Sequence, residues 1–264
     1  MPSRSLRSTR TDIGGLRLHA RVSASQQSAP AVVLVHGLIS SRYFVPTAER
    51  LVGSCRVFLP DLPGFGASPV SKAAQDVTGL TDALAAYMSA SGLEAAVVVG
   101  HSVGSQTVVD LALRYPHLVR RAVLTAPTFD PEARTVTRQY GRWLRNVIRE
   151  PPSLNIILAR EALELGVVRP VRLMRSFLLD HIEDKVGQVA VPTLVVRGEF
   201  DTISTRSWAE RIADLLPLAR LAVIPGAPHT VTYSAPVEFS ELIRAFSGGG
   251  KAVTASRPPA QNRG

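Results

Sequence analysis

The stretch "VVVGHSVGSQ", Val97 to Gln106, places a serine between two glycines directly after a run of valines. A continuous β-branched run is typical of a strand that is buried on both faces. The residues that follow, "VGSQTVVDLALRYP", have helical spacing, so Ser102 lies where a strand passes into a helix. The form G-x-S-x-G at such a junction is typical of a strained turn that lifts a serine hydroxyl above a sheet. Gly100 and Gly104 flank this turn, and we expect that neighbouring backbone comes so close to them that a side chain would not fit.

The same alternation of strand and helix patterns extends along most of the chain. Apolar runs typical of buried strands are "AVVLVHG", "RVFLP", "AAVVVG", "RRAVLTAP", "PTLVVRGE" and "ARLAVIPG", and helical patterns separate them. This order predicts an α/β protein with a mostly parallel central sheet and helices on both faces. The segment Leu16–Val22, "LRLHARV", alternates apolar and polar residues, and we expect it to be a half-exposed edge strand.

The alternation stops between residues 128 and 189. This segment has three helical patterns instead, "ARTVTRQYGRWLRNVIRE", "SLNIILAREALELG" and "PVRLMRSFLLDHIEDKV", with prolines 151, 152 and 170 expected to separate them. We therefore predict that residues 1–127 and 190–247 form the core and that residues 128–189 form an inserted helical lid, called the cap segment below. The remaining residues, 248–264, are rich in Gly, Ser and Pro and are predicted to be disordered.

Composition limits the class of protein and its partners. The chain has 264 residues, of which 45% are hydrophobic, and it carries a net charge of +9. Seven of those nine charges lie in the first 21 residues or after Phe246, and no recognition motif accompanies them, so specific nucleic-acid binding is not expected. A single cysteine, Cys55, excludes an internal disulfide and is expected to be a buried thiol. With no membrane-spanning run and no secretion signal, the sequence favours a cytoplasmic location.

A serine is a poor nucleophile at neutral pH unless a general base activates it. His229, in "VIPGAPHT", follows the last predicted strand and so lies at the same sheet edge as Ser102. Asp201, in "VVRGEFDTIS", follows the preceding strand and can hold the imidazole in one tautomer. The order Ser102, Asp201, His229 is that of an acyl-transfer triad on this kind of turn. Asp130, in "APTFDPE", stays open as the alternative acid.

The developing oxyanion of such a reaction needs two N–H donors. We expect the backbone amide of Val103, directly after the candidate nucleophile, to be one donor. The loop after "AVVLVHG" supplies the second, for which we choose the amide of Leu38. Of the remaining acids, Asp61 in "DLPGFG" is interpreted as a turn former, and Glu199 as pointing away or capping its loop. No metal or cofactor is expected.

The motifs "VLVHGL", "DLPGFGAS", "VVVGHSVGS", "LVVRGEFD" and "PGAPH", in this order, resemble those of the α/β-hydrolase superfamily. The resemblance covers about Leu16 to Phe246. Within the superfamily, the chain is similar to capped bacterial serine hydrolases, which include carboxylesterases and carbon–carbon bond hydrolases. It implies the α/β-hydrolase fold with an inserted lid. Two departures are Ser105, where many relatives have glycine, and Thr230, where carbon–carbon hydrolases acting on ring-cleavage products commonly have tryptophan.

The expected activity is cleavage of a small or medium carboxylic ester through an acyl-enzyme. Two alternatives remain open: a hydrolase of a carbon–carbon bond in a β-diketone-like acid, and a binding or signalling protein with little turnover. The first requires a cation near the pocket, which the cap arginines Arg138, Arg142 and Arg145 could supply, although such a series is more typical of a solvated helix face. The expected partner is a small ester or related acyl compound, and the oligomeric state stays open.

Overall fold

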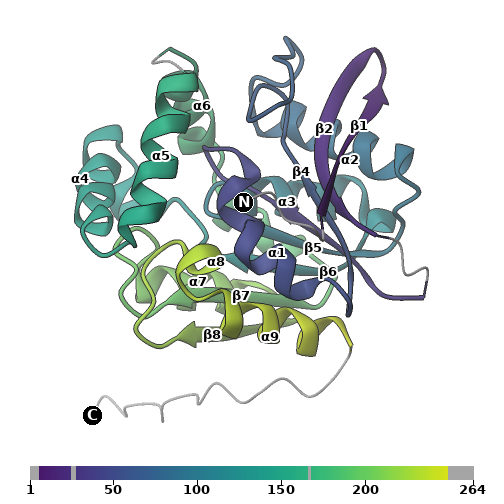
Figure 1. Cartoon of the computed structure of the whole chain (residues 1–264). Coiled ribbons are helices and arrows are strands. Elements are labelled where there is room, and N and C mark those ends of the chain that lie inside the picture. The colour runs from purple at the N-terminus through teal and green to yellow at the C-terminus, as the bar shows by residue number, and fades with distance from the viewer. Residues whose placement is uncertain (1–5, 25–27, 166–167, 249–264) are drawn as a thin grey trace.

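The computed structural model describes residues 6–24, 28–165 and 168–248. Within them, eight strands form one sheet in the order β1-β2-β4-β3-β5-β6-β7-β8 (Figure 1). Neighbours from β4 to β8 are parallel, whereas β2 pairs antiparallel with both β1 and β4. The strands are β1 (Leu6–Ile13), β2 (Leu16–Ser23), β3 (Ala31–Val35), β4 (Arg56–Pro60), β5 (Ala96–His101), β6 (Val119–Thr125), β7 (Thr193–Gly198) and β8 (Ala219–Ile224). The predicted, mostly parallel α/β sheet is confirmed.

The amino-terminal edge of the sheet differs from the prediction. β2 is not the edge strand, because β1 pairs with it along the whole length from Leu6 opposite Ser23 to Ile13 opposite Leu16. Gly14 and Gly15, both with positive φ, make the turn between the two strands. Most side chains of β1 remain exposed, so this strand has no apolar pattern that would have predicted it. Some of the basic residues before Leu16, such as Arg7 and Arg10, therefore belong to a β-hairpin.

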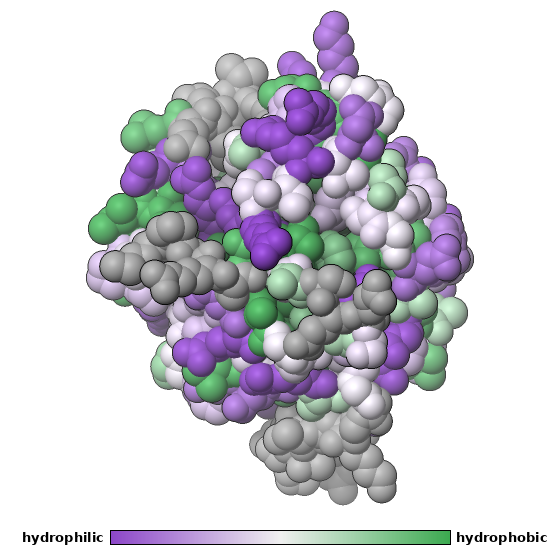
Figure 2. Space-filling model, turned by 45° about the vertical axis from the view of Figure 1, so that its right-hand side comes forward, coloured by the Kyte–Doolittle hydropathy of each residue, from purple (hydrophilic) through white to green (hydrophobic). Residues whose placement is uncertain are grey.

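Helices cover both faces of the sheet. One face carries α1 (Val45–Leu51), α8 (Val231–Ser234) and α9 (Pro236–Ser247), and the other carries α2 (Val77–Ala90), α3 (Gly104–Arg114) and α7 (Arg206–Leu215). Short 3-10 helices are η1 (Ser41–Phe44), η2 (Pro116–Leu118), η3 (Pro131–Ala133), η4 (Ile182–Asp184) and η5 (Val186–Gln188). On the face drawn in Figure 2, hydrophobic residues lie in small groups among hydrophilic ones.

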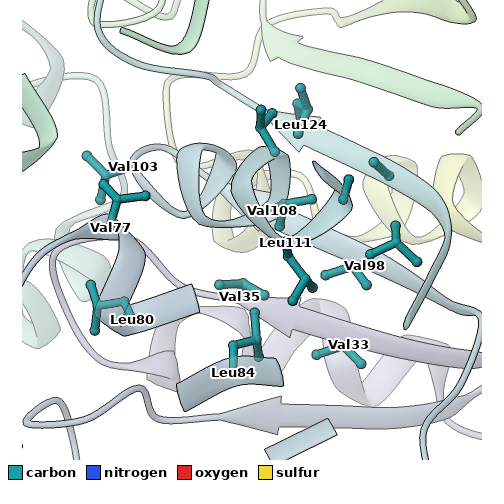
Figure 3. Close-up of a cluster of buried hydrophobic side chains, with 14 of the residues drawn as sticks. Val33, Val35, Val77, Leu80, Leu84, Val98, Val103, Val108, Leu111 and Leu124 are labelled. Atoms are coloured by element: carbon teal, nitrogen blue, oxygen red, sulfur yellow. The ribbon is translucent and has the colours of Figure 1, made fainter. Parts of the chain in front are cut away.

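The central strands are continuously apolar because their side chains pack into a hydrophobic core on each face of the sheet. In β5, Val98 packs against α2 and α3, whereas Val97 and Val99 point to the opposite core beside α1 and α9. Figure 3 shows the first of these clusters, in which Val98 of β5 lies among side chains of α3 and of the neighbouring strand β3. Since a strand alternates its side chains between faces, only a continuous apolar run fills both cores.

The cap segment contains the three predicted helices, between β6 and β7. They are α4 (Val136–Val147), α5 (Pro152–Leu165) and α6 (Val168–Leu179), which lie together on one side of the sheet in Figure 1. Pro170 does not separate two helices as expected, because it lies in the first turn of α6, where a missing N–H costs no helical hydrogen bond. The predicted disorder at 249–264 lies outside the described residues. No helix in the described part of the chain is long and apolar enough to cross a membrane.

Candidate active site

Ser102 occupies a strained turn between β5 and α3. Its φ is +56°, a left-handed conformation that is uncommon for a residue other than glycine, and its amide donates to the carbonyl of Thr125 at 2.8 Å. A Cβ added at Gly100 would lie 2.5 Å from the carbonyl oxygen of Gly104, and one added at Gly104 would lie 2.6 Å from that of His36. Both flanking glycines are therefore required by close backbone contacts. Such strain is typical of functional sites.

The structure brings His229 and Asp201 together beside this turn. Nδ1 of His229 lies 2.9 Å from Oδ2 of Asp201, and both side chains are buried. The other carboxylate oxygen of Asp201 accepts from the amides of Ile203 at 2.8 Å and Ser204 at 2.9 Å. The carboxylate is thereby fixed in orientation, and it holds the His229 proton on Nδ1, which leaves Nε2 available as a base.

The charges around His229 favour its protonated form. Burial alone would lower the pKa of the imidazole, but the Asp201 carboxylate, its hydrogen bond and the charge of Glu150 together raise that pKa above the ordinary value. The neighbouring His101 is different. Burial, together with the charge of His229, holds the pKa of His101 well below its ordinary value, so this ring stays neutral. The imidazolium that forms during a proton transfer is thus stabilised only on His229.

Two amides near Ser102 are candidate oxyanion donors. Within the described part of the chain, the N–H groups of Leu38 and Val103 have no hydrogen-bond partner. Both residues line the same pocket as Ser102. The helix α3 begins directly after Val103, so its positive end lies at the same place. Leu38 and Val103 therefore remain the candidate donor pair.

Buried polar contacts tie the loop after β3 to the histidine loop. The amide of Gly37 donates to the hydroxyl of Tyr43 at 2.7 Å, and that hydroxyl lies 3.0 Å from Nδ1 of His101. On its other side, Nε2 of His101 lies 3.2 Å from the carbonyl oxygen of His229. Burial raises the pKa of Tyr43, so its hydroxyl stays protonated and donates to His101. This requires the His101 proton on Nε2, from which it donates to His229.

These groups open into a pocket of about 360 Å³. Ser102 and His229 both line it, and no hydrogen bond with a described residue engages the Ser102 hydroxyl. The cap segment closes the pocket with apolar and aromatic side chains, namely Val136, Tyr140, Trp143, Val147, Leu158, Ala162 and Met174. A larger hollow of about 620 Å³ lies at the opposite, amino ends of the strands and contains none of the candidate residues. We therefore place the site in the smaller pocket.

Comparison with known proteins identifies the family and the fold. A family model described as the alpha/beta hydrolase fold matches residues 30–156. The 2-(acetamidomethylene)succinate hydrolase of Mesorhizobium japonicum is 26% identical over 259 residues, spanning 87% of this chain and 91% of that protein. The sn-1-specific diacylglycerol lipase of Mus musculus is 27% identical over 285 residues, spanning 92% of this chain and 89% of that protein. The chain belongs to the α/β-hydrolase superfamily.

A solved structure agrees with the fold of this α/β hydrolase. Carboxylesterase CesB from Bacillus subtilis matches with a TM-score of 0.70 at 20% identity, covering 94% of this chain and 93% of that chain. Among the described residues, no three His, Cys, Asp or Glu side chains are grouped so that they could hold a metal ion.

The alternative acid, Asp130, does not contact His229. Its carboxylate lies 2.9 Å from the guanidinium of Arg142 and caps η3 through the amide of Glu132 at 2.9 Å. Arg142 is thereby paired, and neither it nor Arg138 nor Arg145 lines the pocket of this α/β hydrolase. The guanidinium of Arg138 donates to a cap carbonyl. The structure thus favours Asp201 over Asp130 as the partner of His229.

Sequence reasoning missed a pair of cap residues that hold the histidine loop of this α/β hydrolase. Oδ1 of Asn146 accepts from the amide of His229 at 3.1 Å, and its Nδ2 donates to Oε1 of Glu150 at 2.8 Å. The same Oε1 accepts from the amide of Thr230 at 2.8 Å. Asn146 lies in the last turn of α4 and Glu150 lies three residues after its end, and in the sequence their spacing of four resembles that of an exposed helix face. Nothing in the sequence marks the pair as buried.

Asp61 also has a larger role than the predicted turn. It is buried, and it accepts from Nδ1 of His19 at 2.8 Å, from the Ser41 hydroxyl at 2.6 Å and from the amide of Ala67 at 3.0 Å. Glu199, by contrast, caps its loop as expected, through the amide of Gly226 at 2.8 Å. A motif such as "DLPGFG" shows where the chain turns, but not that the acid points inward.

Proposed function

We propose that this protein is a serine hydrolase that cleaves small or medium carboxylic esters through an acyl-enzyme. The observation that carries the proposal is that the candidate nucleophile and the candidate base line the same pocket. Ser102, at φ +56°, and His229, bound to Asp201 at 2.9 Å, both line it. Free amides of Leu38 and Val103 at the same wall add the donors that an oxyanion needs.

In the proposed reaction, Nε2 of His229 takes the hydroxyl proton as Ser102 Oγ attacks the ester carbonyl carbon. The carbonyl oxygen becomes an oxyanion and accepts from the amides of Leu38 and Val103. Collapse of this intermediate breaks the bond to the alcohol oxygen, and His229 returns its proton to that leaving group. Water then attacks the acyl-enzyme with His229 again as the base, which releases the acid and restores Ser102. Asp201 orients the imidazole and stabilises its protonated form throughout.

Three features support an ester as the substrate. The pocket volume of about 360 Å³ fits a small or medium ligand, and its wall is mainly apolar. The relatives include a lipase and a carboxylesterase. The cap arginines that an acidic carbon–carbon substrate would need do not line the pocket, which gives that alternative no support.

A fluorophosphonate probe and a series of p-nitrophenyl esters from acetate to decanoate test the proposal. We expect labelling of Ser102 and turnover of the shorter esters, both abolished in Ser102→Ala. Ser207→Ala, an exposed serine on α7, is the matched control and should behave as the unmodified protein. Labelling without ester turnover would favour the carbon–carbon substrate, and absence of labelling would favour a binding protein; either result overturns the ester proposal.

A further inference from the structure

Glu150 is the acidic residue in the wall of the candidate pocket. The described side chains that line this pocket include Glu150 and no Asp, Lys or Arg. The residue is 5% exposed, so its charge lies in a region of low polarity rather than in water.

Two N–H donors hold one oxygen of the Glu150 carboxylate in place. Oε1 accepts two N–H donors, from Asn146 and from the amide of Thr230, both at 2.8 Å. Oε2 is buried and has no hydrogen-bond partner among the described residues. Both donors are uncharged amides, so they orient the carboxylate without cancelling its charge.

Two other buried carboxylates of the cap segment, neither of which lines the pocket, have a cation nearby. Asp130 lies 2.9 Å from the guanidinium of Arg142, and Glu161 lies 3.7 Å from that of Arg42. Glu150 has no ion pair with any residue that the structure describes. Its charge is therefore the least compensated of the three.

The Asp201 carboxylate differs from that of Glu150 because it has a titratable partner. Its Oδ2 lies 2.9 Å from Nδ1 of His229, and the guanidinium of Arg197 donates to the main-chain carbonyl of Asp201 at 3.0 Å. The charge of Glu150 reaches the reacting centre, because it contributes to the raised pKa of His229. Glu150 is thus an acidic side chain in the described pocket wall beside Ser102, with no described Lys or Arg in that wall to pair with it.

We propose, resting on the ester-hydrolase function above, that Glu150 is a specificity-determining residue that makes the pocket favour uncharged substrates over anionic ones. A carboxylate on the substrate would enter an apolar space beside a fixed negative charge, with no described cationic side chain in the wall to offset it. A neutral acyl chain meets no such penalty.

Two p-nitrophenyl esters of similar length test this: the butyrate, which is neutral, and the hemiglutarate, which ends in a carboxylate. Each is measured at the pH plateau of the variant concerned. We expect kcat/KM of the unmodified protein to favour the neutral ester. In Glu150→Gln, which keeps the shape and the acceptor oxygen, the ratio of anionic to neutral kcat/KM should rise about tenfold or more. Glu132→Gln removes the same charge from an exposed site on the cap segment and should leave the ratio unchanged.

The outcomes separate the two proposals. If the protein hydrolyses neither ester and no probe labels Ser102, the ester-hydrolase function is wrong. If both esters are hydrolysed but the ratio is the same in Glu150→Gln, Glu150 has only a structural role, since misplacing the histidine loop would slow both esters by one common factor. If Glu150→Gln does not fold, the unmodified protein still decides the matter, because equal kcat/KM for the two esters contradicts the proposal.

Discussion

The hydroxyl of Tyr43 lies 2.7 Å from the amide nitrogen of Gly37, so a buried phenol fixes the backbone one residue before the candidate oxyanion donor Leu38. The same hydroxyl contacts His101 at 3.0 Å, and His101 in turn contacts the carbonyl of His229. The loop that would hold the oxyanion and the loop that carries the base are therefore joined by two rings.

Tyr43→Phe should weaken both loops. It leaves the amide of Gly37 and Nδ1 of His101 buried without a partner, which we expect to lower the free energy of unfolding by about 1–3 kcal/mol. A looser Leu38 amide should also lower kcat on p-nitrophenyl butyrate by about tenfold. Tyr87→Phe removes another buried hydroxyl, on α2 and away from the pocket, and should affect stability alone. Equal kcat in both variants would show that Tyr43 does not position the oxyanion loop.

Asp201→Asn should reduce kcat far more than it reduces stability. An amide in place of the carboxylate cannot hold the His229 proton on Nδ1 with the same charge, and the expected loss in kcat is about 10⁴-fold. Asp130→Asn is the matched control, because Asp130 pairs with Arg142 rather than with His229. If Asp130→Asn proves the more damaging to kcat while both variants remain folded, the assignment of the acid is reversed.

The acidic limb of the pH profile of kcat/KM should report His229. Its imidazole must be neutral to act as a base, and its pKa is raised, so activity should fall with decreasing pH at a value above the ordinary histidine pKa of about 6.5. The charge of Glu150 contributes to this raised value. Glu150→Gln should consequently move the limb to lower pH, whereas Glu132→Gln should leave it in place. A limb that moves upward in Glu150→Gln contradicts this electrostatic coupling.

The sequence predicts the parts of this fold that depend on continuous apolar runs. The side chains of Val97–Val99 pack into the two hydrophobic cores in turn, which only a strand buried on both faces allows. The position of Ser102 in the turn follows from the glycines beside it. The edge strand β1 could not be predicted in the same way. Its stability comes from backbone pairing with β2, which leaves most of its side chains free to be polar.

The sequence could predict those residues of the candidate site that directly follow a strand of the sheet. Ser102, Asp201 and His229 each follow a parallel strand, and such ends meet at one sheet edge. Asn146 and Glu150 come instead from the cap segment, whose position over the sheet follows from tertiary packing rather than from a local pattern. Their burial depends on contacts with a loop about 80 residues away, at His229 and Thr230.

Asp61→Asn should destabilise the fold in a pH-dependent manner. This carboxylate accepts from His19, Ser41 and Ala67, and the guanidinium of Arg21 lies 3.9 Å from it. An asparagine would direct its own N–H₂ at one set of them, and we expect a loss of about 3 kcal/mol in the free energy of unfolding at pH 7. Burial alone would raise the pKa of Asp61, but the hydrogen bonds from these donors outweigh it and hold the pKa well below the ordinary value.

A lowered pKa fixes the sign of the pH effect. The carboxylate stabilises the folded state above the ordinary aspartate pKa of about 3.9, and this contribution is lost as the pH falls from there towards the lowered value. The gap in unfolding free energy between the unmodified protein and Asp61→Asn should therefore narrow as urea titrations move from pH 7 into that acidic range. Asp214→Asn, at an exposed aspartate on α7, should show no such gap at any pH. A gap for Asp61→Asn that widens in acid would mean that the carboxylate is not held in its charged form by these donors.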